Sequence, residues 1–197
     1  MDTTLLQKAI TAAQAGKLII YPTDTQYALG CILTHPQTIK HLFNIKKRPP
    51  TLALPVAVAS IKDISTIATI TPLQKQVAHS FLPGPLTMVL PKKPTVPSEV
   101  TASGNTLAIR IPDHPITLQL LHKTGPLIIT SANIHGQKPY EDIHDIQKQF
   151  GEEIAVYLPG GILNNPPSTI IDFTHTPPQL LRPGPISLPE IINVMTK

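Results

Sequence analysis

The sequence predicts an α/β or α+β layered fold. Segments with the apolar spacing of helices alternate with short apolar runs typical of strands along the whole chain. Apolar residues make up 41% of the 197 residues and aromatic residues only 4%, so aliphatic side chains must fill the core. No internal repeat, low-complexity tract or shift in composition marks a boundary. We therefore expect one domain spanning residues 1–197.

Helices are predicted where apolar residues recur with helical spacing behind a capping residue or a proline. In chain order, the predicted helices are one from a Thr3 or Thr4 cap to about Gly16, residues 36–45, one after Ser60, one after Thr71, and residues 114–122, 142–150 and 188–195.

Strands are predicted at short apolar runs that are bounded by turn residues. These runs are residues 17–21, 54–59, 86–90, 107–111, 127–130, 154–158 and 169–173. The segment 22–30, which follows the first strand, contains Pro, Asp, Thr and Gly and is predicted to be a loop.

The composition excludes several classes of protein. The single cysteine, Cys31, excludes a disulfide framework and any multi-cysteine metal site, and it is predicted to be a small core residue. No secretory signal and no apolar run of the roughly 18 residues that a membrane span needs are visible, so we expect a cytoplasmic protein. The net charge of +4 fits a polyanionic ligand such as a nucleotide, or weak contact with nucleic acid.

Several catalytic signatures are absent. The chain has neither a P-loop nor a G-x-G-x-x-G fingerprint, and neither H-E-x-x-H nor G-x-S-x-G occurs. The histidine pairs His35/His41 and His114/His122 lack the short spacing of zinc ligands, so no protein metal site is expected.

Polar segments lie instead at the ends of predicted strands and helices. They are PTDTQYALG (22–30), KKRP (46–49), PGPLT (83–87), TLAIRIP (106–112), TSAN (130–133), PSTIID (167–172) and LRPG (181–184). Because ligands of open α/β sheets bind at strand ends, these segments can converge on one cleft. Lys46, Arg48, Arg110 and Arg182 would make it suited to phosphate and carboxylate groups. The alternative is that each segment is an ordinary turn or cap.

Read together and in this order, the segments resemble the YrdC-like family of threonylcarbamoyl-AMP synthases. The resemblance extends from Leu18 to about Gly184 and includes the motifs PTDTxYxLG, KxRP, PGPLT, R-x-P-x-H-P, TSANxxG, STIID and LRPG. The chain departs from the family pattern at Gln26, Ala28, Ala57 and His135. The resemblance implies a short single-domain form with a twisted mixed sheet, flanking helices and a concave, positively charged cavity.

The resemblance also implies a reaction in which L-threonine, bicarbonate and ATP give threonylcarbamoyl-adenylate and pyrophosphate. Its catalytic residues would be Lys46, Arg48, Ser131 and Asn133. The ATP-binding residues would be Arg48, Thr106, Asn133 and Arg182, with Mg2+ on the phosphates. The threonine-binding residues would be Thr25, Arg110, Ser131 and Ser168. The expected downstream partner is the tRNA threonylcarbamoyl-transferase complex, with weak tRNA or RNA binding left open and no membrane partner.

Two alternatives remain at this point. One is a paralogue of the same fold that acts on another carbamoyl or nucleotide substrate. The other is a non-catalytic module that holds double-stranded RNA in a basic cavity. The absence of Trp, together with only four Tyr and four Phe, gives little support to single-strand stacking.

Overall fold

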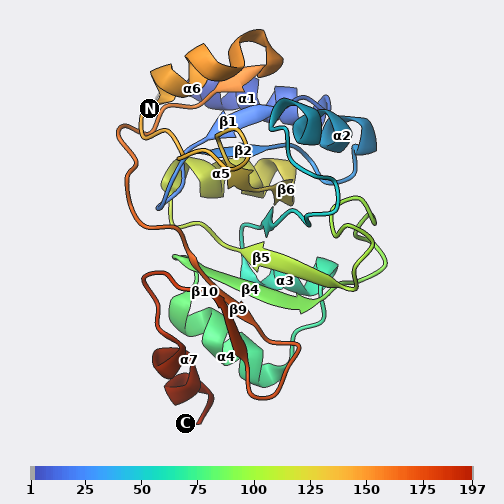
Figure 1. Cartoon of the computed structure of the whole chain (residues 1–197), viewed down its shortest axis with the longest axis vertical. Coiled ribbons are helices and arrows are strands. Elements are labelled where there is room, and N and C mark those ends of the chain that lie inside the picture. Colours follow the sequence, from blue (N-terminus) through green and yellow to red (C-terminus); the bar gives the residue numbers. More distant parts are fainter. Residues whose placement is uncertain (1–2, 197) are drawn as a thin grey trace.

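The computed structural model describes residues 3–196, and it contains two mixed β-sheets (Figure 1). The four-stranded sheet has the order β7 (Thr130–Ser131), β2 (Ala28–Gly30), β1 (Ile19–Tyr21) and β8 (Val156–Tyr157). The six-stranded sheet has the order β10 (Gln179–Arg182), β9 (Thr169–Asp172), β4 (Leu86–Pro91), β5 (Thr106–Arg110), β3 (Val56–Ala57) and β6 (Leu127–Ile128). Both sheets combine parallel and antiparallel pairs, which confirms the mixed α/β class.

The helices divide between the two halves of the molecule in Figure 1. The half with the four-stranded sheet contains α1 (Thr3–Gln14), α2 (Pro36–Ile45), α5 (Pro115–Thr124) and α6 (Ile143–Phe150), which a short 3-10 turn (Gly151–Glu153) follows. The other half contains α3 (Ile61–Ile67), α4 (Pro72–Phe81) and α7 (Leu188–Met195). Within residues 3–196, none of these helices has both the length and the apolar character that crossing a bilayer requires.

Two of the predicted helix caps, Ser60 and Thr71, are present, whereas Thr3 and Thr4 lie within α1 itself. Ser60 accepts a hydrogen bond from the backbone N–H of Asp63 at the start of α3. Thr71 forms a capping box with Gln74 at the start of α4, and each side chain accepts from the other residue's backbone N–H. Local sequence signals therefore located these helix starts correctly.

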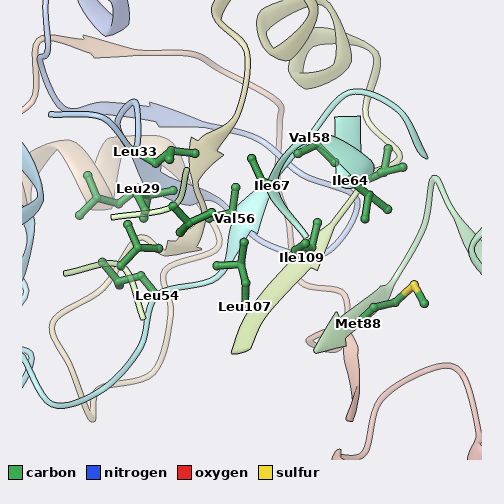
Figure 2. Packing of buried hydrophobic residues seen from close by; sticks show 14 of the residues in the cluster. Leu29, Leu33, Leu54, Val56, Val58, Ile64, Ile67, Met88, Leu107 and Ile109 are labelled. Carbon is green, nitrogen blue, oxygen red and sulfur yellow. The ribbon is translucent and has the colours of Figure 1, made fainter. Parts of the chain in front are cut away.

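The main hydrophobic core extends across both halves. Leu29 and Leu33 pack in the same cluster as Val56, Ile109 and Met88 (Figure 2). In β5 the side chains alternate: Leu107 and Ile109 are buried in this core, while Ala108 and Arg110 line a cavity on the other face. One face of β5 thus anchors the sheet and the other is available to a ligand.

The segment 127–131 joins the two sheets. Leu127 and Ile128 pair with β3, whereas Thr130 and Ser131 pair with β2. Tyr21 donates its hydroxyl hydrogen to the carbonyl oxygen of Ile128 at 2.7 Å, which fastens the crossing point. The strand that we predicted at 127–130 is therefore divided between two sheets, and Ser131 is carried to the boundary between them.

Some sequence expectations differ from the structure. Residues 28–30 form β2 and are not part of a loop, because they pair with β1 and β7 on either side. The strand β10 was not predicted, because all four of its residues are exposed and show no alternation of apolar and polar side chains. The mixed sheet that the resemblance implies is present as two mixed sheets, because the segment 127–131 passes from one to the other.

Candidate active site

Two adjoining cavities lie between the sheets. The first has a volume of about 300 Å³ and the second a volume of about 430 Å³. Gln26, Arg48, Ser131, Pro167 and Arg182 line both, so the cavities share a wall. A ligand that fills both cavities would contact Arg48 and Arg182.

Arg110 lies in the wall of the first cavity and is 5% exposed. Its Nη2 donates to Asp24 Oδ1 at 2.6 Å, its Nη1 to Thr25 Oγ1 at 2.9 Å, and its Nε to the carbonyl oxygen of Gly84 at 3.1 Å. Burial lowers the pKa of Arg110, while the Asp24 carboxylate partly offsets that shift. The guanidinium is therefore held by three acceptors, two in the β1–β2 loop and one on Gly84.

The β1–β2 loop is a tight turn built around the Thr23 hydroxyl. Thr23 Oγ1 accepts from the backbone N–H groups of Thr25 and Gln26, and it donates to the Gln26 carbonyl oxygen at 2.6 Å. Thr25 Oγ1 already accepts from Arg110, so its own hydrogen is available to a ligand or to Thr23 Oγ1, which is 3.1 Å away.

A second hydroxyl pair lies across the first cavity. Thr87 Oγ1 and Ser168 Oγ are 2.8 Å apart, and both side chains are buried. Arg182 donates from Nη2 to Ser168 Oγ at 3.0 Å, and from Nε and Nη2 to the Ser168 carbonyl oxygen. Two sides of this cavity thus carry hydroxyl groups that are polarised by an arginine.

Lys46 organises the second cavity. Its ammonium donates to the carbonyl oxygens of Ser131 at 2.5 Å and Asn133 at 2.7 Å, and to Asn133 Oδ1 at 3.3 Å. Ser131 Oγ donates to the same Asn133 Oδ1 at 2.6 Å. Because Lys46 is only 1% exposed, burial lowers its pKa to about 7, and the nearby Arg48 charge adds to this shift.

Arg48 lies at the shared wall and is half-buried. Its Nη2 donates to the carbonyl oxygen of Ala53 at 2.8 Å, and its Nε contacts that of Leu52 at 3.4 Å. Burial lowers the pKa of Arg48 and of Arg182. Among the described residues that line the two cavities, none is Asp or Glu, so the walls are positively charged.

The donor set does not fit a protein-held metal ion. Within residues 3–196, no group of three or more His, Cys, Asp or Glu side chains could hold one. The hydroxyl, amide and cationic groups of the cavities instead suit carboxylate and phosphate oxygens.

The structure brings most of the predicted site residues together. Thr25, Arg48, Arg110, Ser131, Ser168 and Arg182 line the first cavity, and Lys46 and Asn133 line the second. Thr106 lies at the opposite end of β5 from Arg110 and lines neither cavity.

Sequence reasoning missed several other residues of the site. Asp24, Thr23 and Thr87 lie inside motifs that we singled out, yet no local pattern shows that they contact Arg110, Gln26 and Ser168. Gln26, Pro167 and His135 also line the cavities. The position of His135 in the segment after TSAN is the one signal that could have indicated its place.

Comparison with known proteins decides the family. The family model for Sua5, YciO and YrdC proteins, described as telomere recombination, matches residues 11–184. The chain belongs to the Sua5/YciO/YrdC family. A threonylcarbamoyl-AMP synthase of Pyrococcus abyssi is 37% identical over 183 residues, which cover 91% of this chain and 54% of that protein. The corresponding protein of Photobacterium profundum is 34% identical over 185 residues, 91% of this chain and 98% of that protein.

Solved structures of the Sua5/YciO/YrdC family agree with this fold. P. abyssi Sua5 complexed with L-threonine matches with a TM-score of 0.90 and 36% identity, over 96% of this chain and 56% of that chain. E. coli YciO matches with a TM-score of 0.87 and 26% identity, over 94% of this chain and 91% of that chain. The chain thus spans about half the length of the P. abyssi relative, 54%.

Proposed function

We propose that this chain is an L-threonylcarbamoyladenylate synthase, a nucleotidyltransferase that forms threonylcarbamoyl-AMP and pyrophosphate from L-threonine, bicarbonate and ATP. One observation carries the proposal: two adjoining, positively charged cavities share Arg48, Ser131 and Arg182. Relatives named for this activity are 33–37% identical over at least 91% of the chain.

The first cavity is the proposed threonine site, formed by Thr25, Arg110, Ser131 and Ser168. The Thr25 and Ser168 hydroxyl groups can donate to the threonine carboxylate while Arg110 and Arg182 supply positive charge behind them. The P. abyssi relative has been solved in complex with L-threonine, which supports threonine as the amino acid.

The second cavity is the proposed site of the ATP phosphates. Arg48, Asn133 and Arg182 would contact them. Thr106 lines neither cavity, and its assignment to the nucleotide rests on the resemblance alone. Since the lining residues offer no carboxylate, we assign no metal ligand in this chain. Mg2+ would enter on the ATP phosphates, where it neutralises charge.

The reaction needs positioning and charge neutralisation, because the carbamate of threonine is itself the nucleophile. Arg48 and Arg182 lie where the two cavities meet, so they can hold the carbamate against the α-phosphate. Lys46 holds the Ser131 and Asn133 backbone through its side-chain nitrogen. The second amide hydrogen of Asn133 can then donate to the reacting groups without adding charge, and the Ser131 hydroxyl can do the same when it turns away from Asn133 Oδ1.

We further propose that residues 1–197 form a single domain that acts in the cytoplasm. The unstable adenylate would pass to a tRNA threonylcarbamoyl-transferase complex, so the chain would act in the threonylcarbamoyl-adenosine modification of tRNA.

The test is pyrophosphate release from ATP by the purified chain. We expect release that requires both L-threonine and bicarbonate, and that falls at least about 100-fold in Arg48→Ala, since a charge contact at the reacting phosphate is lost. Lys75→Ala, which removes an exposed lysine of α4, is the matched control. A paralogue would release pyrophosphate with a different co-substrate, and an RNA-binding module would release none.

A further inference from the structure

His135 lies in the loop after β7 and lines the second cavity but not the first. Its backbone N–H donates to the carbonyl oxygen of Lys46 at 2.8 Å, which fixes this loop against the end of α2. Asn133 Nδ2 donates to the carbonyl oxygen of Gln137 at 2.5 Å and closes the same loop. The exposed imidazole is therefore attached to the cavity wall by a well-defined backbone.

The charges that face His135 are mainly positive. Lys46 and Arg48 line the second cavity from the end of α2, and Arg182 lines it from β10. On the loop itself, Lys138 is paired with Glu141 at 3.3 Å, so these two charges largely offset each other. An anion in the second cavity would meet positive charge on two sides, and a protonated imidazole would add a third.

The order of the two cavities indicates which anion this would be. In-line displacement at the α-phosphorus requires the attacking and leaving oxygens to lie on opposite sides of that atom. If the carbamate approaches from the first cavity, the leaving pyrophosphate lies on the far side of the shared wall. His135 is in that direction, because it lines only the second cavity.

We propose that His135 is a ligand-binding residue that binds the leaving pyrophosphate group of ATP in its imidazolium form. This inference rests on the proposed function. In the step concerned, a carbamate oxygen forms a bond to the α-phosphorus while the bond from that phosphorus to the bridging oxygen breaks. Pyrophosphate leaves with the electron pair, and the imidazolium N–H donates a charge-assisted hydrogen bond to one of its oxygens.

A pH dependence follows, because histidine is the side chain that ordinarily gains its charge between pH 8 and pH 5. The affinity for pyrophosphate and ATP, compared with that for AMP, should increase as the pH falls through this range. Lys46 and the phosphate groups also titrate close to this pH range. The contribution of His135 is therefore the portion of the pH dependence that a His135 variant removes.

The experiment measures the Kd of inorganic pyrophosphate by calorimetry at pH 6 and pH 8, for the full chain and three variants. His135→Asn keeps a polar side chain without the charge, and His135→Lys carries a charge at both pH values. His79→Asn, an exposed position on α4 that lines neither cavity, is the matched control. The melting temperature of each variant is recorded at both pH values.

We expect His135→Asn to bind pyrophosphate at least about fivefold more weakly than wild type at pH 6, and about equally at pH 8. His135→Lys should bind tightly at both pH values, and His79→Asn should match wild type throughout. A purely structural role would change the melting temperature and would not be restored by lysine.

Equal affinities of wild type and His135→Asn at both pH values would overturn the inference, even if the wild type releases pyrophosphate with threonine and bicarbonate. A weakening that is the same at pH 6 and pH 8 would also overturn it. If the wild type binds no pyrophosphate and shows no turnover, the proposed function fails and the role of His135 fails with it.

Discussion

At the scale of single residues, the site depends on cations that are held by other protein groups before any ligand arrives. Arg110 is the strongest case, because Asp24, Thr25 and the Gly84 carbonyl accept from it. This pairing could not be read from the sequence, since Asp24 and Arg110 are 86 residues apart and no local pattern links them. The residue type was predictable, but its partners were not.

Replacing Arg110 should affect threonine more than ATP. Arg110→Ala leaves Thr25 without its guanidinium donor, so we expect the KM for threonine to rise at least about tenfold and that for ATP to change less than about threefold. The variant also leaves the Asp24 carboxylate unpaired, at a cost of roughly 3 kcal/mol or more in stability. Steady-state kinetics on Arg110→Ala and on Arg110→Lys, which keeps the charge, test this prediction. Equal rises in both KM values would contradict the assignment of the first cavity to threonine.

The buried Lys46 should make stability depend on pH. Its pKa in the folded chain is lowered to about 7 from an ordinary value of 10.5. Between these values the unfolded chain holds a proton that the folded chain has released, so the free energy of unfolding rises with pH across that window. Below about pH 7 both states are protonated, and this group contributes no pH dependence.

Urea unfolding at pH 7 and pH 9 measures this effect. We expect the wild type to gain at least about 1 kcal/mol more than Lys46→Met over this interval, because only the wild type has the group that titrates. The comparison concerns the change with pH, so any constant loss of stability in the variant does not affect it. Parallel changes in the two proteins would show that Lys46 remains protonated in the folded chain.

At the scale of elements, the predictable parts are those with a local signal. The caps Ser60 and Thr71 and the strand at β5 could be predicted, because each depends on residues close in sequence. The strands β2 and β10 could not be predicted, because they form only by pairing with other strands. The crossing of the segment 127–131 between two sheets is also a tertiary feature that one sequence does not encode locally.

The end of β10 gives a prediction at this scale. A Cβ on Gly184 would lie 2.4 Å from the backbone nitrogen of Thr169 and 2.6 Å from the carbonyl oxygen of Pro167. Gly184→Ala must therefore push β10 away from Ser168, and Arg182 loses its bonds to that residue. We expect a loss of roughly 2 kcal/mol or more in stability, since the clash is with backbone atoms, together with a clear drop in pyrophosphate release.

Gly125→Ala is the control for this substitution. Gly125 ends α5 with a φ of 75° and has nothing within 4 Å of the Cβ position. Its ψ of −162° places it in a region that essentially only glycine occupies, so its replacement should cost about 1–3 kcal/mol through backbone strain alone and leave turnover unchanged. If both variants lose turnover equally, the close approach at Gly184 does not position Arg182.

At the scale of the whole molecule, the sequence predicted that polar strand ends converge, and the structure brings eight of the nine predicted site residues into two cavities, Thr106 being the exception. The division into two compartments with a shared arginine wall was not predictable, because it depends on how the two sheets meet. In the proposed reaction, this division places threonine in one cavity and the leaving pyrophosphate in the other.

The most direct measurement follows the carbon of bicarbonate. The chain is incubated with ATP, L-threonine and 13C-labelled bicarbonate, and the nucleotide products are analysed at once by mass spectrometry. We predict an adenylate that contains both threonine and the labelled carbon, formed by the wild type and lost in Arg48→Ala. If AMP or ADP forms without any labelled threonine adduct, or if the label enters equally well without threonine, the central claim is contradicted.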